Sequence, residues 1–380
     1  MTADAADAAD AATPIDQPRD VRADDAIDAE KVGAWLAERV PGLAGTPDVK
    51  QYSGGASNLT YLLRYPDRDL ILRRPPAGTK AKSAHDMRRE YRIQSLLKPT
   101  FPYVPEMVAF CDDPDVLGDP AEPDDPDGPD AAGGADFYVM ERLSGIILRG
   151  RLPQGMVLPP EQARALCDAV VNRLVELHAV DVTATGLDEF GRGSGYVGRQ
   201  VAGWSQRYRA AKTWNVPSFE KVMGWLEANQ PEDVGTCLIH NDWRLDNLVL
   251  DADDPGQILG VLDWEMATVG DPLMDLGSAM AYWVQADDDR LMGLLRRQPT
   301  HLPGMRTREE MVRAYCERSG RQVDDWTFYE VFGLFRLAVI VQQIYFRYAH
   351  KQTRNPAFRH FWIAVNYLDR RCRRLIPQVC

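Results

Sequence analysis

The stretch LIHNDWRLDNLVLD, residues 238–251, places His240, Asp242 and Asn247 between two apolar runs. The motif GVLDWE follows shortly afterwards and adds Asp263. Ionisable side chains flanked by strand-like segments are costly to bury, so they are usually paired, bound to a metal or used in chemistry. This stretch is therefore the first candidate for a functional site.

The sequence before this stretch predicts a small β-rich unit. YLLRY and LILRR are typical of adjacent strands joined by the turn PDRD, and VPEMVAFC and ADFYVMERL predict two more strands. SAHDMRREYRIQSLL has the apolar spacing of a helix. We expect an N-terminal lobe over residues 31–143. An acidic insertion at 112–136 should be flexible, because Pro, Gly and Asp dominate it.

The sequence after residue 143 is mostly helical. PEQARALCDAVVNRLVELHAV begins with proline, and TREEMVRAYCERSG has a capping box from Thr307 to Glu310 and a closing Gly320. The apolar stretch VFGLFRLAVIVQQIYF is interrupted by Arg336. It predicts a buried core helix, because a membrane span needs about 20 nearly uninterrupted apolar residues. We expect a helical C-terminal lobe over residues 144–380.

The net charge of −12 is unevenly distributed. Residues 1–30 carry nine acids and two bases, and residues 112–136 carry ten acids and no base, so the remaining residues have a net charge of +5. A mildly basic folded part suits an anionic small ligand and gives no sign of a nucleic-acid surface. The Ala/Asp-rich residues 1–30 predict a disordered acidic tail.

The six cysteines form no CxxC pair and no close cluster with histidine. This spacing argues against a disulfide framework or a structural zinc site and favours a reducing compartment. The N-terminus is acidic and has no apolar signal-peptide core. We therefore expect a soluble cytoplasmic protein without a membrane partner. The sequence leaves its oligomeric state open.

The residue types around Asp242 suit phosphoryl transfer. That reaction needs a carboxylate to accept the attacking hydroxyl's proton, oxygen ligands for magnesium and cations on the phosphates. Asp242 is a candidate base, and Arg244 lies two residues later, where it can reach toward the transferred group. Asn247 offers a neutral amide oxygen and Asp263 a charged oxygen to the metal.

His240-x-Asp242-x-x-x-x-Asn247 followed by Asp263 resembles the catalytic and metal-binding segments of the aminoglycoside phosphotransferase family. The segments LRRPP, HNDWRLDN and YEVFGLFRLAVIVQQIY are most similar to the kinase-like domains linked to acyl-CoA dehydrogenases. This resemblance implies an α+β, protein-kinase-like bilobal fold and the cofactors ATP and Mg²⁺. It also implies that Asp275, in GDPLMDLG, tethers the catalytic loop.

The resemblance extends upstream to the nucleotide site. YSGGASNLTY occupies the place of the phosphate-covering loop, Arg73 falls where the family has its phosphate-pairing lysine, with Arg74 as the alternative, and Glu90 is its helix partner. FYVMERLSG matches the segment that meets adenine through backbone groups. The implied nucleotide-binding residues are Ser53, Gly54, Gly55, Ser57, Asn58, Arg73, Glu90, Met140, Glu141 and Leu143.

Three interpretations remain open at this point. We favour an ATP- and Mg²⁺-dependent phosphotransferase acting on a hydroxyl of a small molecule, possible acceptors being a hydroxyacyl thioester or another metabolite. A nucleotide-binding pseudokinase with a regulatory or scaffold role is the second, because an arginine stands at the lysine position. A purely structural helical protein is the third. The net basic residues 300–380 favour a neutral or anionic acceptor over a polycation.

Overall fold

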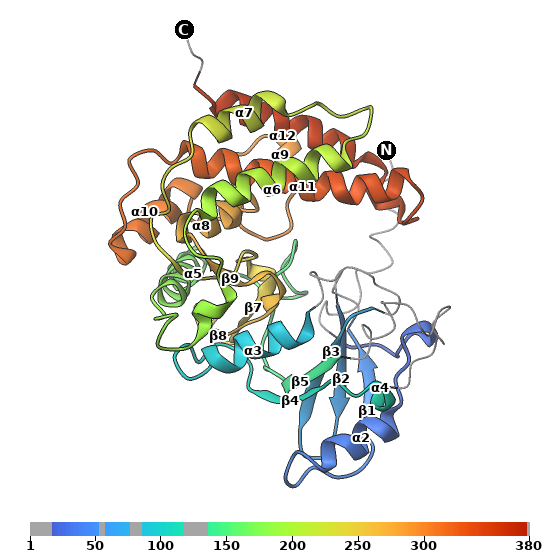
Figure 1. Ribbon diagram of the computed structural model, residues 1–380. Coiled ribbons are helices and arrows are strands. Elements are labelled where there is room, and N and C mark those ends of the chain that lie inside the picture. The colour runs from blue at the N-terminus through green and yellow to red at the C-terminus, as the bar shows by residue number, and fades with distance from the viewer. Residues whose placement is uncertain (1–16, 53–57, 77–85, 118–135, 378–380) are drawn as a thin grey trace. The chain divides into compact units, whose positions relative to one another are not determined.

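The computed structural model describes residues 17–52, 58–76, 86–117 and 136–377. The chain divides into two compact units: unit 1 comprises residues 1–147, 153–156 and 259–266, and unit 2 comprises 148–152, 157–258 and 267–380. An antiparallel sheet characterises unit 1, and unit 2 is mostly helical (Figure 1), so the predicted α+β class is confirmed. The two units alternate along the chain instead of meeting at one boundary such as the predicted 143/144. The segment 259–266, which carries Asp263, returns to unit 1.

The sheet of unit 1 is antiparallel and has the order β1-β2-β3-β5-β4. Its strands are β1 (Asp48–Gln51), β2 (Leu59–Arg64), β3 (Asp69–Arg74), β4 (Met107–Cys111) and β5 (Phe137–Glu141). Because successive side chains of a strand point to opposite faces, the sheet buries two separate apolar clusters. One cluster includes α2 (Ala29–Ala37) through Trp35 and Leu36. The other includes Met87 of α3 (Met87–Leu97) together with Ile71 and Tyr138.

The prediction of a disordered tail is wrong for residues 17–30, while residues 1–16 lie outside the described residues. Arg19 exchanges two backbone hydrogen bonds with Gln51, at 2.8 and 2.7 Å. The buried Gln51 side chain donates to the Asp25 carboxylate at 2.8 Å, and the Tyr61 hydroxyl donates to the Asp25 carbonyl at 2.7 Å. The segment, with η1 (Ala23–Asp25), is therefore ordered against the sheet through an isolated bridge to Gln51, which composition could not reveal.

The acidic insertion begins with a short helix, α4 (Pro114–Leu117), which we predicted to be flexible. Val116 and Leu117 are buried in the same cluster as Trp35. This part of the prediction is wrong, because two apolar side chains suffice to anchor the turn on α2. Residues 118–135 of the insertion lie outside the described residues.

Unit 2 is built around the long helix α11 (Thr327–Ala349), which packs against α6, α8 and α12 (Figure 1). The capping box and the C-terminal glycine predicted for residues 307–320 are confirmed. Further helices of unit 2 are α5 (Pro160–His178), η2 (Leu187–Phe190), α6 (Tyr196–Ala211), α7 (Glu220–Ala228), α8 (Pro272–Ala281), α9 (Arg290–Leu294), α10 (Arg308–Ser319), η5 (Pro356–His360) and α12 (Phe361–Leu375).

Helices α8 and α11 approach each other at a pair of glycines. A Cβ atom on Gly333 would lie 2.2 Å from the carbonyl oxygen of Gly277, and one on Gly277 would lie 2.7 Å from that of Tyr329. Both distances are shorter than van der Waals contact, so neither position accepts a larger residue without moving a helix. Every residue of α8 is buried. Helix α8 is consequently a fixed support for the loops at its ends.

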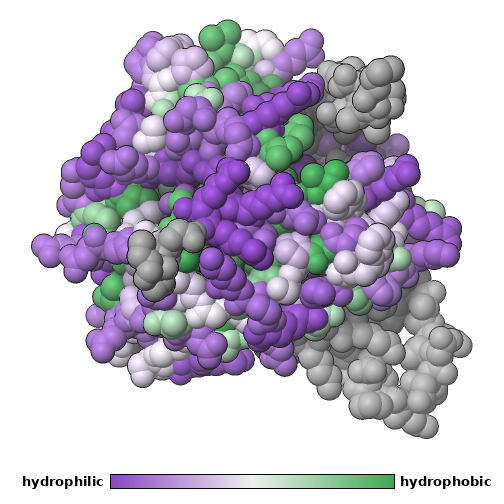
Figure 2. All heavy atoms as spheres, turned by 90° about the horizontal axis from the view of Figure 1, so that it is seen from above, coloured by the Kyte–Doolittle hydropathy of each residue, from purple (hydrophilic) through white to green (hydrophobic). Residues whose placement is uncertain are grey.

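Helix α11 is long and apolar enough to cross a membrane by length and composition, but 72% of its apolar window is buried within the fold. Tertiary packing thus accounts for its apolar character. On the face of the molecule seen in Figure 2, hydrophilic side chains predominate and hydrophobic side chains gather in small separate patches.

Candidate active site

The loop after β6 (Cys237–Ile239) carries the motif HNDWRLDN. A buried carboxylate holds this loop in place. Strand β6 pairs with β9 (Thr268–Gly270), which leads directly into α8. From α8, Asp275 accepts hydrogen bonds from the backbone N–H groups of His240 and Asn241, at 2.9 and 2.7 Å. Asn241 has a positive φ of 64°, a conformation that side chains rarely adopt and that these bonds stabilise. The predicted tethering role of Asp275 is confirmed.

Asp275 is itself held by a chain of buried groups. His178 of α5 lies 3.1 Å from its carboxylate through Nε2, and Nδ1 of His178 lies 2.7 Å from the Tyr315 hydroxyl. Burial would raise the pKa of Asp275, but the hydrogen bonds from His178 and from the loop outweigh burial and lower it. The carboxylate therefore stays ionised and keeps accepting from the loop. His178 is itself buried, 4% exposed.

Asp242, Arg244 and Asn247 meet within this loop, and the last of them ends η3 (Leu245–Asn247). Nδ2 of Asn247 donates to both the carboxylate and the backbone carbonyl of Asp242, each at 2.9 Å. Arg244 lies 3.2 Å from the Asp242 carboxylate and 3.2 Å from Asp246. With its nitrogen engaged, Asn247 presents its amide oxygen as the group that remains for a metal. The Asp242 side chain is 20% exposed, so an incoming hydroxyl has access to it.

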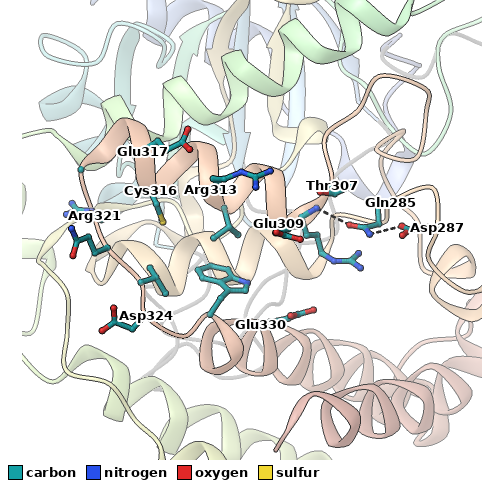
Figure 3. A pocket seen from close by; sticks show the side chains of 16 residues that line it. Gln285, Asp287, Thr307, Glu309, Arg313, Cys316, Glu317, Arg321, Asp324 and Glu330 are labelled. Carbon is teal, nitrogen blue, oxygen red and sulfur yellow. Dashed lines mark hydrogen bonds between the residues drawn. The ribbon is translucent and has the colours of Figure 1, made fainter.

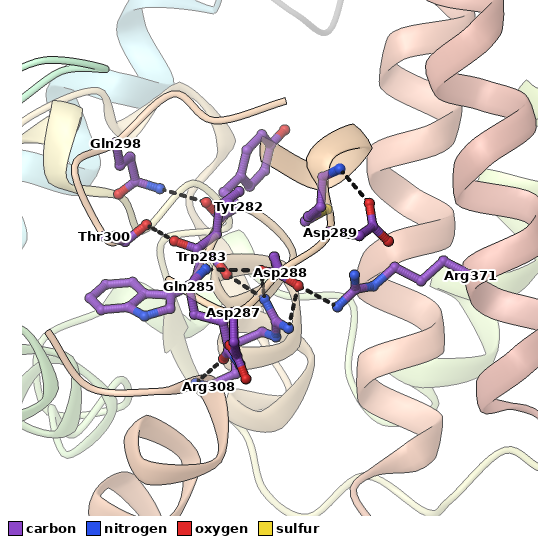
Figure 4. A network of polar contacts seen from close by, with 12 residues as sticks. Tyr282, Trp283, Gln285, Asp287, Asp288, Asp289, Gln298, Thr300, Arg308 and Arg371 are labelled. Atoms are coloured by element: carbon purple, nitrogen blue, oxygen red, sulfur yellow. Dashed lines mark hydrogen bonds and ion pairs between the residues drawn. The ribbon is translucent and has the colours of Figure 1, made fainter. Parts of the chain in front are cut away.

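A polar network that we did not predict also holds this loop. Gln298 accepts from the Leu245 backbone N–H at 2.7 Å and donates to the Tyr282 carbonyl at 3.3 Å. The Tyr282 ring lies 4.7 Å from the Arg244 guanidinium, in a cation–π contact. The segment after Tyr282 continues to Asp288, which binds Arg308 of α10 and Arg371 of α12 (Figure 4). These partners lie far apart in sequence, so no local pattern indicates them.

Unit 1 holds the other predicted side chains, and here the structure distinguishes the two candidate arginines. Arg73 lies 2.7 Å from Glu90 of α3 and 3.1 Å from Asp263. Arg74 points away from this cluster and donates to the Tyr61 hydroxyl at 3.2 Å. Burial alone would lower the pKa of Arg73, but Glu90 and Asp263 raise it, so the guanidinium stays charged. Burial raises the pKa of Glu90 although Arg73 opposes this.

Asp263 is positioned by a strained backbone and by its neighbours in sequence. It has a φ of 66° and precedes η4 (Trp264–Met266). Trp264 is fully buried and donates through Nε1 to the Val261 carbonyl at 2.9 Å, which anchors the turn. Glu265 accepts from Nδ2 of the buried Asn58 at 3.1 Å. Glu265 is a further residue that sequence reasoning missed, because its partner lies 207 positions away.

The predicted adenine-contacting segment forms the end of β5. Met140 is buried, and the Glu141 N–H already donates to the Glu106 carbonyl at 2.9 Å, so that N–H is not the group offered to a base. A Cβ on Gly260 of β8 (Ile258–Val261) would lie 2.0 Å from Cδ1 of Leu143. Leu143 therefore packs where only glycine fits. The phosphate-loop residues Ser53, Gly54, Gly55 and Ser57 lie outside the described residues.

The two predicted metal ligands carry oxygen atoms, which is the type of ligand that magnesium prefers. Mg²⁺ prefers hard oxygen ligands and is usually bound by one or two protein side chains, with phosphates and water completing its shell. Asn247 offers an amide oxygen and Asp263 a carboxylate, each described within its own unit. Within the described ranges no group of three or more His, Cys, Asp or Glu side chains is arranged to hold a metal. A dedicated all-protein cage is thus not found among those residues.

A broad groove of about 1040 Å³ runs along α10 in unit 2 (Figure 3). Arg313, Cys316 and Glu317 on the helix and Glu330 at the start of α11 line it. Its walls include both cations and carboxylates, and Asp242, Arg244 and Asn247 are not among its lining residues. The groove is consequently not part of the candidate active site.

A family model described as the phosphotransferase enzyme family matches residues 48–323. Mouse acyl-CoA dehydrogenase family member 10 is 37% identical over 319 residues, which are 82% of this chain and 28% of that protein. Human acyl-CoA dehydrogenase family member 11 is 31% identical over 333 residues, 85% of this chain and 40% of that protein. The chain thus spans well under half the length of these relatives. The predicted similarity to domains linked to acyl-CoA dehydrogenases is confirmed.

Solved structures confirm the predicted kinase-like fold. A protein of Ralstonia eutropha jmp134 assigned as an aminoglycoside phosphotransferase has a TM-score of 0.75 and 28% identity, with 92% of this chain and 98% of that chain covered. An aminoglycoside phosphotransferase in ternary complex with AMP-PNP and hygromycin B has a TM-score of 0.56 at 15% identity, with 92% of this chain and 100% of that chain covered. At 15% identity the second likeness concerns the fold alone.

Proposed function

Because this chain belongs to the phosphotransferase enzyme family, we propose that it transfers the γ-phosphoryl group of ATP, with Mg²⁺, to a hydroxyl of a small molecule. The observation that carries the proposal is the geometry of Asp242. Its carboxylate is held by Asn247 and Arg244 on a loop that Asp275 ties to the buried helix α8. A fixed, partly exposed carboxylate is what a general base for an alcohol requires.

In this reaction Asp242 accepts the proton of the attacking hydroxyl. The hydroxyl oxygen forms a bond to the γ-phosphorus, the bond from phosphorus to the bridging oxygen breaks, and ADP leaves with that electron pair. Arg244 lies 3.2 Å from the Asp242 carboxylate and supplies positive charge beside the transferred group. Asn247 and Asp263 would hold Mg²⁺, which when bound neutralises charge on the phosphate oxygens.

Arg73 takes the place of the phosphate-pairing cation in this proposal. Its contacts to Glu90 at 2.7 Å and Asp263 at 3.1 Å fix the guanidinium in a charged state. An arginine keeps the charge of the lysine usual in the family and can bind two phosphate oxygens at once. For Asp263 to bind Mg²⁺ together with the nucleotide, its carboxylate would have to give up part of its contact with Arg73.

Two observations favour a class of acceptor: the net charge of residues 300–380 and the names of the relatives. Residues 300–380 are net basic, which favours an anionic or neutral acceptor over a polycation. The relatives of mouse and human are named for acyl-CoA dehydrogenases, whose substrates are acyl thioesters. We therefore propose a hydroxylated acyl compound, as the free acid or as its thioester, as the acceptor to test first.

A regulatory nucleotide-binding protein is the second candidate function. The ion pair between Arg73 and Asp263 favours it, because this contact occupies an oxygen that a metal would need. Such a protein would bind nucleotide with little dependence on magnesium and would transfer phosphate neither to an acceptor nor to water. Comparing nucleotide-dependent thermal stabilisation with and without magnesium separates the two candidates.

The Asp242→Asn variant tests the enzyme assignment. It preserves the shape of the loop but removes the base, so turnover should fall by about 100-fold or more, the usual scale for a positioned general base. Nucleotide affinity should remain, because Asn247 and Asp263 are unchanged. Asp253→Asn makes the same chemical change on an exposed turn and should retain full activity. Equal turnover of Asp242→Asn and wild type, with matching melting profiles, would remove Asp242 from the chemistry.

A further inference from the structure

Arg336 is a buried cation beside the catalytic loop that the reaction described above does not use. It lies in the middle of α11, and the residue is 5% exposed. One terminal nitrogen donates to the backbone carbonyl of Asn241, the residue before Asp242, at 2.8 Å. Burying a guanidinium is costly unless its charge is compensated, so its position calls for an explanation.

The compensation present in the fold is incomplete. The Arg336 guanidinium lies 5.1 Å from the ring centroid of Trp204 on α6, and Arg207 of the same helix lies 4.6 Å from that ring. One indole therefore contacts two cations. In the described part of the chain, the partners of Arg336 are the Asn241 carbonyl and the Trp204 ring, and the partner of Arg207 is that same ring. A carbonyl and an aromatic face stabilise a cation less than an anion does.

Arg336 acts on the same place as the proposed chemistry. The pKa of Tyr282 is raised, first by burial and then by Asp242, whereas Arg244 and Arg336 oppose the rise. The charges of Asp242, Arg244 and Arg336 thus all act on the Tyr282 side chain. Because Asn241 and Asp242 are consecutive, the Arg336 guanidinium contacts the backbone directly before the proposed base.

We propose that Arg336 is an acceptor-binding residue, which takes an anionic oxygen of the hydroxylated acceptor and thereby places its hydroxyl at Asp242. This inference rests on the proposed function and specifies its substrate: an acceptor that carries a carboxylate or a phosphate. The contacts to Asn241 and Trp204 hold the guanidinium in place before binding, which lowers the ordering cost. Arg207 supplies a second, exposed cation for an anionic group farther from the hydroxyl.

The same arrangement discriminates against other acceptors. A polycation would meet two uncompensated positive charges, and a neutral alcohol would leave the Arg336 charge without its partner. A purely structural arginine would also donate to the Asn241 carbonyl, but it would be indifferent to the charge of the acceptor. Charge dependence is therefore the property that separates acceptor binding from loop support.

The experiment measures ligand binding to the full chain loaded with a non-hydrolysable ATP analogue and magnesium. Three probes share one acyl chain: β-hydroxybutyrate, its uncharged methyl ester and β-hydroxybutyryl-CoA. The variants are Arg336→Gln, Arg336→Lys and Arg207→Gln. Arg347→Gln is the matched control, because it removes an exposed cation from the same helix. Saturation-transfer NMR and titration calorimetry give affinities without requiring turnover.

We expect the wild type to bind at least one charged probe and to bind the methyl ester at least 10-fold more weakly. Arg336→Gln should lose roughly 10- to 100-fold in affinity for the acid, the scale of one charged hydrogen bond, while Arg336→Lys and Arg347→Gln retain more. A loss in Arg336→Gln for the CoA thioester but not for the acid would assign the bound anion to the CoA phosphates, whereas a loss for the acid assigns it to a carboxylate.

Three results would overturn the inference: no binding of either charged probe to the wild type, equal binding of the ester, or unchanged affinity of the Arg336→Gln variant for both charged probes. Nucleotide affinity, measured in the same samples, shows whether Arg336→Gln has kept the loop folded. The proposed function fails separately. If wild type binds nucleotide and acid but transfers no phosphate, the anion site stands and the phosphotransferase assignment does not.

Discussion

At the scale of single residues, Arg73 forms ion pairs with two carboxylates: Glu90, which is buried, and Asp263, whose side chain is 33% exposed. Removing one partner of a buried ion pair leaves an uncompensated charge, which costs about 3–5 kcal/mol. Arg73→Met should therefore destabilise the protein by an amount of that order, measured by urea denaturation. The double variant Arg73→Met/Glu90→Met should recover much of the loss, because it removes both charges.

The exposed Arg68→Met change in the β2–β3 turn is the control and should be nearly neutral. A double variant no more stable than Arg73→Met would contradict the ion-pair explanation. The sequence could not choose between Arg73 and Arg74, since they are adjacent and identical in type. In a strand, neighbours point to opposite faces, and only the pairing register with β2 and β5 shows which face lies toward Glu90.

At the scale of elements, α4 shows how little apolar sequence is needed to order a segment. Leu117 is 4% exposed and packs in the cluster of α2 and the sheet. Leu117→Ala should destabilise unit 1 by about 2–4 kcal/mol, the range for a buried leucine truncated to alanine. Asp115→Ala, an exposed change in the same helix, should alter the free energy of unfolding by less than about 0.5 kcal/mol. Equal effects of the two variants would show that α4 does not pack.

Elements set by local signals could be predicted, and those set by distant partners could not. Helix α10 begins and ends where its capping box and glycine indicate, because both signals lie within the helix itself. The ordered residues 17–28 depend on Gln51, and the average composition of the tail conceals that dependence. Likewise, Val116 and Leu117 lie in a segment whose average composition is acidic, so composition does not reveal that these two side chains are buried.

At the scale of the whole molecule, the order of motifs along the chain predicted the fold and indicated Asp242, Asn247 and Asp263 as candidate site residues. The supporting residues Tyr282, Gln298 and Arg336 were not predicted, because each acts on the catalytic loop from a distance of tens of residues. The return of residues 259–266 to unit 1 is of the same kind. Motifs indicate the candidate site residues, whereas long-range packing determines what holds them.

The two units should also respond differently to acid. In unit 2, hydrogen bonds outweigh burial and lower the pKa of four carboxyls. The partners are arginines for Asp168 and Asp288, backbone N–H groups for Asp233, and His178 with the loop backbone for Asp275. Burial raises the pKa of Asp246, Asp271 and Asp369 in the same unit, which opposes the effect in part. In unit 1, burial raises the pKa of Glu90 and Asp136.

The sign of the stability change follows from these directions. A carboxyl whose folded pKa lies below its unfolded value of about 3.9 stabilises the fold above that pH, and the stability is lost as the pH falls through the folded pKa. A carboxyl with a raised pKa favours the folded state when protonated, so acid does not remove its contribution. We therefore expect unit 2 to lose protection first when the pH is lowered from 7 toward 3.

Hydrogen exchange followed by mass spectrometry over this pH range measures the order directly, since peptides report on each unit separately. Asp288→Asn is the matched variant. It removes one charge from the pairs with Arg308 and Arg371, so unit 2 should be less stable at pH 7 and lose less on acidification than wild type. Earlier exchange in the sheet of unit 1 than in α8 and α10 would contradict the prediction. An unchanged pH dependence in Asp288→Asn would show that other carboxyls carry the effect.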